Sequence, residues 1–382
     1  MLNTSKVPQA NPHAGYVAYK EEIDNAIARV LASGIYILGQ EVELFEKAFS
    51  KFIGVFYGIG VASGTDAIEV ALRAAGVGKG DLVFTVSHTA VATVAAIERC
   101  SAQPVLIDVD DSSYTIDTDD LEETIQGVFE GTIPVQGQPR AIVPVHLYGH
   151  PAKMDTIMDI SRKYNLIVIE DCAQAHGARI NGKNVGTFGH MATFSFYPTK
   201  NLGAIGDGGM VVTNSENLYN TLRCLRQYGW IRRYISSTDG INSRLDELQA
   251  AILRVKLNYL ERDNQIRKGI AERYDEILNE TEIGSPEVAG HVEHVYHQYV
   301  IRTKERDSFI KHMEDNHIGT AIHYPIPVHL QPAYKNRLHL GPARLEKTEK
   351  LCDEIVSLPM YPQMTIYEVD RVRNALASWG RC

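Results

Sequence analysis

The sequence predicts an α/β protein with a large, mostly parallel β-sheet and a smaller C-terminal α+β unit. Short apolar segments alternate with helical segments between residues 55 and 213. Apolar strands separated by helices are typical of a parallel sheet that helices cover on both faces. A long helical pattern follows, and a short series of strands and helices beyond it predicts the second unit.

Two amphipathic helices are predicted before the sheet begins, over residues 18–34 and 40–54. Both end at a glycine, Gly34 and Gly54, because glycine readily adopts the left-handed conformation that closes a helix. The predicted strands of the sheet are 55–62, 81–87, 104–110, 140–149, 166–171, 190–198 and 208–213. The helices predicted between them are 64–76, 89–100 and 152–165.

The C-terminal third is predicted to start with one long helix over residues 245–278. After it we expect a strand over 294–303, a helix over 304–316, a strand over 320–324 and two further helices. We place the domain boundary within the long helix, near residue 255. The predicted domains are therefore 1–255 and 256–382.

Composition argues against several classes of protein. The net charge of −9 argues against nucleic acid or an anionic membrane as the main partner. The N-terminus lacks the apolar core of a secretory signal, and no apolar run approaches the roughly 18 residues of a membrane-spanning helix. The five cysteines are far apart and form no CxxC pair, so we expect reduced thiols, a cytoplasmic protein and no metal site.

Ligands of open α/β sheets bind at the carboxyl ends of the strands, and the segment ASGTDA lies at such an end. Here Ser63, Gly64 and Thr65 join a strand to a helix. Hydroxyls and free N–H groups at a helix N-terminus suit a phosphate, and a plain helix cap is the alternative. No glycine motif typical of a nucleotide P-loop or a dinucleotide site is present, which argues against a nicotinamide-dependent oxidoreductase.

Asp171 and His88 also follow predicted strands. Asp171 closes the apolar strand LIVIED, where a buried acid is costly unless a cation meets it, and a protonated pyridine nitrogen would serve. Glu170 would face the other way along the strand, so we assign the buried role to Asp171. His88 could stack on a planar cofactor. A helix cap for Asp171 and a packed or surface histidine for His88 are the alternatives.

Lys200 lies in FSFYPTKNLGAIGDGG, between a strand and a glycine-rich segment. A lysine becomes a nucleophile when a desolvated or cationic setting deprotonates its amine. The glycines permit close approach of a ligand, and Ser195 could add a phosphate contact. A solvated lysine in a turn is the alternative.

Taken together, these features are the parts of a pyridoxal phosphate site: a phosphate cradle, a stacking ring, an acid for the pyridine nitrogen and a lysine for covalent attachment. The sequence resembles the sugar aminotransferases of the DegT/DnrJ/EryC1/StrS family over nearly the whole chain. The resemblance rests on GQEVELFEKAFS, ASGTDAI, IEDCAQAHGA, FSFYPTKNLGAIGDGG, GINSRLDELQAAIL and HYPIPVHLQPAY. It implies the aspartate-aminotransferase fold.

The resemblance implies a role for each matching residue. Lys200 matches the lysine that holds the cofactor, Asp171 the partner of the pyridine nitrogen, and Gln174 a residue near the ring hydroxyl. His88 matches the ring-stacking position. The positions that match phosphate ligands are Gly64, Thr65 and Ser195, next to Ser63. Asn242 matches a phosphate contact that the neighbouring subunit donates, which implies a homodimer with shared active sites.

The family activity implied is transfer of an amino group from glutamate to a nucleotide-linked keto sugar. The segments YGWIRRYIS and NSRLDELQAAIL look most like members that aminate C3 of a dTDP-linked 3-keto-6-deoxyhexose. C4 or UDP-sugar aminotransferases and a non-catalytic, cofactor-binding regulator are the alternatives. Arg232, Tyr324 and His329 are candidate nucleotide or sugar contacts, with ordinary surface or packing roles as the alternative.

Overall fold

A computed structural model describes residues 6–379 and confirms the predicted α/β fold. Its centre is an eight-stranded sheet with the order β1-β9-β8-β5-β4-β2-β3-β14. β9 runs antiparallel to β1 and β8, whereas the other neighbouring strands are parallel. The strands are β1 (Tyr57–Val61), β2 (Asp81–Val86), β3 (Gln103–Ile107), β4 (Gln138–Ile142), β5 (Ile167–Asp171), β8 (Met191–Ser195), β9 (Gly209–Thr213) and β14 (His339–Leu340).

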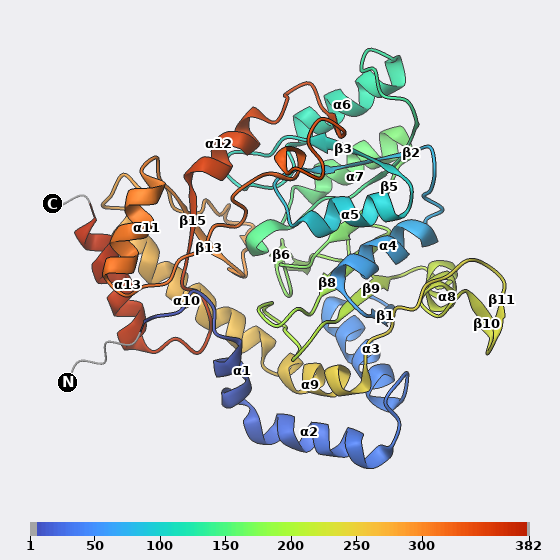
Figure 1. The fold of residues 1–382 in the computed structure, drawn as a ribbon, viewed down its shortest axis with the longest axis horizontal. Helices are drawn as coiled ribbons and strands as arrows, with labels where there is room; N and C mark the ends of the chain where they lie inside the picture. The colour runs from blue at the N-terminus through green and yellow to red at the C-terminus, as the bar shows by residue number, and fades with distance from the viewer. Residues whose placement is uncertain (1–5, 380–382) are drawn as a thin grey trace.

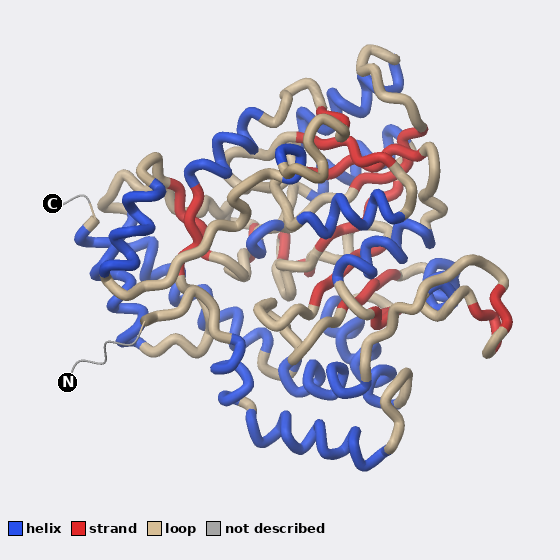
Figure 2. Tube along the Cα trace, in the orientation of Figure 1, coloured by secondary structure: helices blue, strands red, loops and turns tan. Residues whose placement is uncertain are grey.

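Helices cover both faces of the sheet, as Figure 2 shows. Side chains alternate between the two faces of each strand, so Val168 packs under α7 whereas Ile169 belongs to the cluster under α4. The helices up to residue 257 are α1 (Pro12–Ala18), α2 (Lys20–Ser33), α3 (Gln40–Ile53), α4 (Gly64–Ala74), α5 (Val91–Arg99), α6 (Thr118–Glu130), α7 (Met154–Tyr164), α8 (Glu216–Leu225) and α9 (Glu247–Leu257). No helix of the described residues is long and apolar enough to cross a membrane.

Small strands lie outside the central sheet. β6 (Arg179–Ile180), β7 (Lys183–Asn184) and β12 (Val292–Glu293) form one small sheet. β10 (Trp230–Arg232) and β11 (Ile235–Ser236) form a hairpin that extends away from the body of the molecule (Figure 1).

The C-terminal part builds a second core around Tyr274, Tyr299 and Phe309. Its elements are α10 (Leu260–Leu278), β13 (Tyr299–Arg302), α11 (Arg306–Asp315), α12 (Glu346–Glu354), β15 (Ile355–Leu358) and α13 (Ile366–Ser378). β13 and β15 pair antiparallel. The domain boundary near residue 255 stays a prediction, and β14 of the C-terminal part lies in the large sheet beside β3.

Three details of the predicted elements are corrected. The predicted long helix is two helices, α9 and α10, which break at Asn258–Tyr259, where Tyr259 stacks on Tyr19 with ring centroids 4.3 Å apart. The segment 320–324 is not a strand but makes an isolated bridge from Ala321 to Ser357. α6 was not predicted, although Asp117 caps its N-terminus by accepting from the Asp119 and Asp120 amides.

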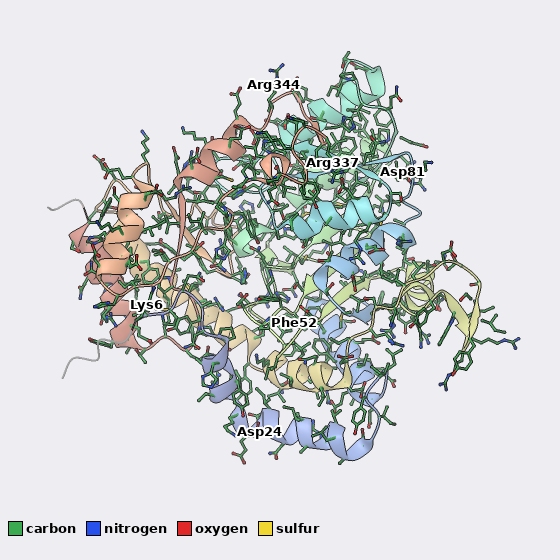
Figure 3. The ribbon with its side chains drawn as sticks, viewed as in Figure 1. Lys6, Asp24, Phe52, Asp81, Arg337 and Arg344 are labelled. Carbon is green, nitrogen blue, oxygen red and sulfur yellow. The ribbon has the colours of Figure 1, made fainter. Side chains whose placement is uncertain are left out.

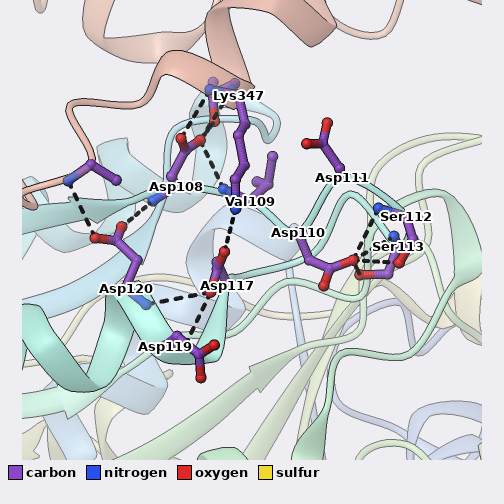
Figure 4. A network of polar contacts seen from close by, with 12 residues as sticks. Asp108, Val109, Asp110, Asp111, Ser112, Ser113, Asp117, Asp119, Asp120 and Lys347 are labelled. Atoms are coloured by element: carbon purple, nitrogen blue, oxygen red, sulfur yellow. Dashed lines mark hydrogen bonds and ion pairs between the residues drawn. The ribbon is translucent and has the colours of Figure 1, made fainter.

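Acidic side chains after β3 tie the C-terminal part to the large sheet (Figure 4). Asp108 is buried and accepts from the backbone N–H groups of Lys347 and Thr348 at the start of α12, at 3.0 and 2.9 Å. The Lys347 ammonium contacts Asp117 at 2.6 Å. Farther along, Arg337, labelled in Figure 3, forms a two-pronged ion pair with Glu98 at the end of α5.

Glu247 holds the N-terminus of α3 against α9. Its buried carboxylate accepts from the backbone N–H groups of Gly39, Glu41 and Val42 at 2.8–2.9 Å. These are the N–H groups that a helix start leaves without intrahelical partners. Glu247 therefore supplies from a distant helix the cap that Ser63 and Asp117 supply locally for α4 and α6.

We predict that Glu247→Ala lowers the free energy of unfolding by about 2–4 kcal/mol, because it leaves buried N–H donors without an acceptor. Equilibrium urea unfolding measures the effect. Glu43→Ala is the matched control, because Glu43 lies in the first turn of α3, the helix that Glu247 caps, is exposed and pairs with the exposed Lys47. Equal losses in the two variants would contradict the capping role.

Candidate active site

Lys200 lies in a tight loop after β8, at the carboxyl end of the sheet. The Lys200 N–H donates to the Tyr197 carbonyl at 2.8 Å, and Ala204 N–H donates to the Phe196 carbonyl at 2.8 Å. A Cβ on Gly203 would lie 2.4 Å from the Pro198 carbonyl oxygen, so the loop can close only with glycine there. The glycine-rich segment is thus needed to fold the chain back under Lys200.

Burial lowers the pKa of Lys200 to about 8, although the Asp171 carboxylate acts in the opposite direction. About a tenth of the amine is therefore neutral at pH 7 and about half at pH 8, and the neutral amine is the nucleophile. Burial also lowers the pKa of neighbouring histidines, to about 3 for His176 and about 4 for His323, with Lys200 as a further cause. These neutral imidazoles therefore add no positive charge beside the Lys200 amine.

Asp171 ends β5 and is buried. Its Oδ1 accepts from the Ala173 N–H at 3.1 Å, and its Oδ2 accepts from the Thr93 hydroxyl at 2.9 Å. Burial raises the pKa of Asp171, while these hydrogen bonds oppose that shift. A carboxylate in this setting gains stability when a cation binds beside it.

Gln174 follows Asp171 in the same loop and is buried. Its Oε1 accepts from the Tyr148 backbone N–H at 2.8 Å, and its Nε2 donates to the Tyr324 hydroxyl at 3.1 Å. The structure therefore brings two predicted residues from distant parts of the chain, Gln174 and Tyr324, into contact.

The start of α4 forms a narrow cradle with the end of β8. Ser63 caps α4 by accepting from the Asp66 N–H at 3.1 Å, and Thr65 lies in the first turn. A Cβ on Gly64 would lie 2.7 Å from Ser195 Cβ, so only glycine allows the two segments to approach this closely. The predicted phosphate residues thus meet at the positive end of a helix dipole.

This donor set fits pyridoxal phosphate. A desolvated amine, a buried carboxylate, an amide and a glycine-lined helix N-terminus match the aldehyde, pyridine nitrogen, ring oxygen and phosphate of that cofactor.

The side chains of His88 and His329 are both buried and hydrogen-bonded to other residues of the chain. His88 is 0 % exposed, and its Nε2 lies 2.8 Å from the Tyr148 hydroxyl, so it lacks the open ring face that stacking requires. His329 is buried with Nδ1 2.8 Å from the Ser87 hydroxyl and Nε2 3.2 Å from Glu349. Both histidines hold loops together, because tertiary neighbours far along the chain enclose their rings. The stacking role of His88 and the substrate contact of His329 stay predictions, and these contacts favour the alternative of packed histidines.

Arg232 and Asn242 lie outside the loops that carry Lys200 and Asp171. Arg232 is exposed on β10 and lines a separate cavity of about 1320 Å³ with Trp230 and Arg244. Asn242 is exposed, whereas the next residue, Ser243, donates to Asp66 in the first turn of α4 at 2.7 Å. The Asn242 segment thus borders the phosphate cradle of its own chain.

Sequence reasoning missed several residues that shape the site. Glu170 is fully buried and accepts from the N–H groups of Gly186, Phe188 and Gly189 at 2.7–2.9 Å and from His146 Nε2 at 3.1 Å. Tyr148 and Thr93 contact the predicted residues directly. The predicted strand over 140–149 ends at Ile142 as β4, so Tyr148 lies in the loop after it instead of within a strand. The four cysteines within residues 6–379 are free.

Comparison with known proteins agrees with this geometry. A model of the DegT/DnrJ/EryC1/StrS aminotransferase family matches residues 17–377. The chain is 46 % identical over 362 residues to dTDP-3-amino-3,6-dideoxy-alpha-D-galactopyranose transaminase from Aneurinibacillus thermoaerophilus, covering 95 % of this chain and 96 % of that protein.

Solved structures of similar proteins share the fold. DesV from S. venezuelae superposes with a TM-score of 0.92 at 40 % identity, over 98 % of both chains. NtdA from Bacillus subtilis, solved with the bound cofactor PMP, gives a TM-score of 0.88 at 32 % identity, over 97 % of this chain and 84 % of that one. The chain therefore belongs to the DegT/DnrJ/EryC1/StrS aminotransferase family, as its motifs predicted.

Proposed function

We propose that this chain uses pyridoxal phosphate to move an amino group from glutamate to C3 of a dTDP-linked 3-keto-6-deoxyhexose. The observation that carries the proposal is the desolvated Lys200 amine near the buried Asp171 carboxylate, at the ends of neighbouring strands. The transaminase from A. thermoaerophilus, named for a dTDP-linked 3-amino-3,6-dideoxy sugar, supports the choice of nucleotide and carbon.

When bound, pyridoxal phosphate supplies an electron sink that lets an amino group leave one substrate and join another. Lys200 Nζ holds the cofactor and, once released from it, accepts and donates the proton that moves during transfer. Its pKa of about 8 suits that task, because general acid–base catalysis works best when the pKa lies near the working pH. Asp171 keeps the pyridine nitrogen protonated, because an opposite charge nearby favours the charged form.

The phosphate group is bound by the cradle of Ser63, Gly64, Thr65 and Ser195. The shape of the cradle supports this role: a side chain on Gly64 would collide with Ser195, whose hydroxyl oxygen lies 3.2 Å from that Cβ position, and Ser63 caps the start of α4.

We further propose a homodimer in which each chain contributes to both active sites. The β10–β11 hairpin carries the exposed apolar side chains Ile231 (64 % exposed) and Tyr234 (74 % exposed), which a second copy would cover. Arg232 on this hairpin would then approach the nucleotide in the partner's site. Asn242 would reach the phosphate there.

Tyr324 is the proposed contact to the sugar from the same chain. Its hydroxyl lies beside Gln174, and burial raises its pKa to about 12, so the hydroxyl stays protonated and able to donate. The position beside the cofactor's ring places this donor where the keto sugar must bind to react.

We predict that Asp171→Asn retains part of the cofactor binding but lowers the rate of amino transfer about a hundredfold or more. Asparagine cannot hold the negative charge, so the pKa of the pyridine nitrogen falls and the electron sink weakens. Single-turnover kinetics measures the rate. The control is Asp155→Asn on the surface of α7, and near wild-type rates in Asp171→Asn would remove Asp171 from the mechanism.

The substrate is tested by mass spectrometry of products formed with glutamate from a panel of dTDP- and UDP-linked 3-keto and 4-keto sugars. We expect a mass change of ketone to amine at C3 of the dTDP-linked sugar, and none with Lys200→Ala. Preferred conversion of a UDP-linked or 4-keto sugar would overturn the substrate assignment. Cofactor binding with no conversion of any sugar would favour a regulator.

Shared sites are tested by mixing Lys200→Ala chains with Asn242→Ala chains under conditions of subunit exchange. Asn242→Ala alone should weaken cofactor retention about tenfold or more, because a hydrogen bond to a charged group contributes about 1.5–3 kcal/mol. In a mixed dimer, the Asn242→Ala chain keeps its Lys200 and receives Asn242 of the partner subunit. That site should regain cofactor affinity and activity.

The second site of the mixed dimer lacks both groups and serves as the internal control. Since Ser243 borders the cradle of its own chain, Asn242 could instead act within one chain. Demonstrated heterodimers with no recovery would establish that reading and exclude sharing.

A further inference from the structure

Tyr148 is a buried tyrosine that contacts Gln174 with its main chain and the C-terminal part with its side chain. It lies in the turn Leu147–Gly149 after β4, with φ 58° and ψ 0°. Few residues other than glycine adopt this left-handed conformation, and those that do cluster at functional sites. The Tyr148 N–H donates to Gln174 Oε1 at 2.8 Å, and its hydroxyl contacts the carbonyl oxygen of His323.

The direction of each hydrogen bond around the Tyr148 hydroxyl follows from its partners. The His323 carbonyl can only accept, so the hydroxyl hydrogen of Tyr148 points there. The Tyr148 oxygen then accepts from His88 Nε2–H at 2.8 Å, which leaves His88 Nδ1 as an acceptor. The Cys352 thiol lies 3.4 Å from Nδ1 and donates to it, because burial raises the pKa of Cys352 to about 12 and keeps the thiol protonated.

The same reasoning orients the Gln174 amide. A backbone N–H can only donate, so the amide oxygen must face Tyr148 and the NH2 group must face the other way. One NH2 hydrogen is used by the Tyr324 oxygen at 3.1 Å. Gln174 keeps its second hydrogen, and Tyr324 keeps its hydroxyl hydrogen, for a ligand.

These contacts close a ring across the two parts of the chain. Tyr148 holds Gln174, Gln174 holds Tyr324, and Tyr324 is joined covalently to His323, which Tyr148 holds in turn. Gln174 and Tyr324 are 150 residues apart in sequence, so the ring forms only when the C-terminal part is seated on the large sheet.

We propose that Tyr148 is a positioning residue that keeps the Gln174 NH2 group directed at the ring oxygen of the cofactor and ties that orientation to the seating of Tyr324. The proposal rests on the proposed function, in which Gln174 contacts this oxygen. His88 contributes by donating from Nε2–H to the Tyr148 oxygen.

The test is the pH dependence of the visible absorption band of the holoenzyme. A hydrogen-bond donor to the ring oxygen of the cofactor stabilises the negative charge on that oxygen. The oxygen then attracts the proton on the lysine nitrogen joined to the cofactor less strongly, and the pKa of that nitrogen is lower. Loosening Gln174 should therefore raise the pKa seen in the band. Tyr148→Phe keeps the main-chain N–H that donates to Gln174 Oε1 but removes the hydroxyl contact that seats His323 and Tyr324, whereas Tyr324→Phe removes the acceptor of the Gln174 NH2 group. We expect an upward shift of about half to one pH unit in both variants.

The controls separate positioning from general loss of structure. Tyr114→Phe changes a neighbouring buried ring, 6.2 Å from Tyr148 between centroids, and should leave the band unchanged. In a Gln174→Leu background, Tyr148→Phe should add no further shift, because the residue through which it acts is gone.

An unchanged band pKa in a folded Tyr148→Phe holoenzyme would overturn the proposal, as would a full shift that persists in the Gln174→Leu background. If Tyr148→Phe does not fold, Tyr324→Phe decides by the same two criteria, since Tyr324 is partly exposed. A wild-type protein that forms no visible band with pyridoxal phosphate would refute the proposed function instead.

Discussion

The register between β5 and β8 decides which side chains meet at the active site. The strands pair in parallel with Glu170 opposite Ala192 and Asp171 opposite Thr193. Since side chains alternate along a strand, a slip of one residue would exchange Asp171 for Glu170 at the site. Glu170 resists that slip, because three backbone N–H groups of the loop 186–189 and the His146 ring hold its carboxylate on the opposite side.

Desolvation then sets the chemistry of the site. No ion pair within 4 Å joins Lys200 to Asp171, so burial lowers the pKa of the lysine and raises that of the acid. Burial likewise lowers the pKa of His297, which adds another neutral imidazole near Lys200. The arrangement keeps a reactive amine and an unpaired carboxylate poised for a cofactor that carries a complementary charge.

The site also depends on contacts between the large sheet and the C-terminal part. Asp108 accepts from the start of α12, and the ring of contacts through Tyr148 and Tyr324 closes directly beside Gln174. Movement of the C-terminal part would therefore alter the hydrogen bond between Gln174 and Tyr324 and the contact between Tyr148 and His323.

Local patterns in the sequence determined the strand–helix alternation, the strand ends and the residues that follow them, and so Lys200 and Asp171 were predicted, whereas the role of Gln174 came from the family resemblance. The local sequence is enough for these features, because strand periodicity and glycine turns depend on residues that are close together in the chain. The break at Tyr259, the closed ring of Tyr148 and the burial of His88 and His329 were decided by tertiary structure. Each depends on partners more than 50 residues away, such as Tyr19 for Tyr259 and Tyr324 for Gln174. A local sequence pattern does not determine which distant side chain packs around a residue. The distant side chains determined the contacts of Tyr259, Tyr148, His88 and His329.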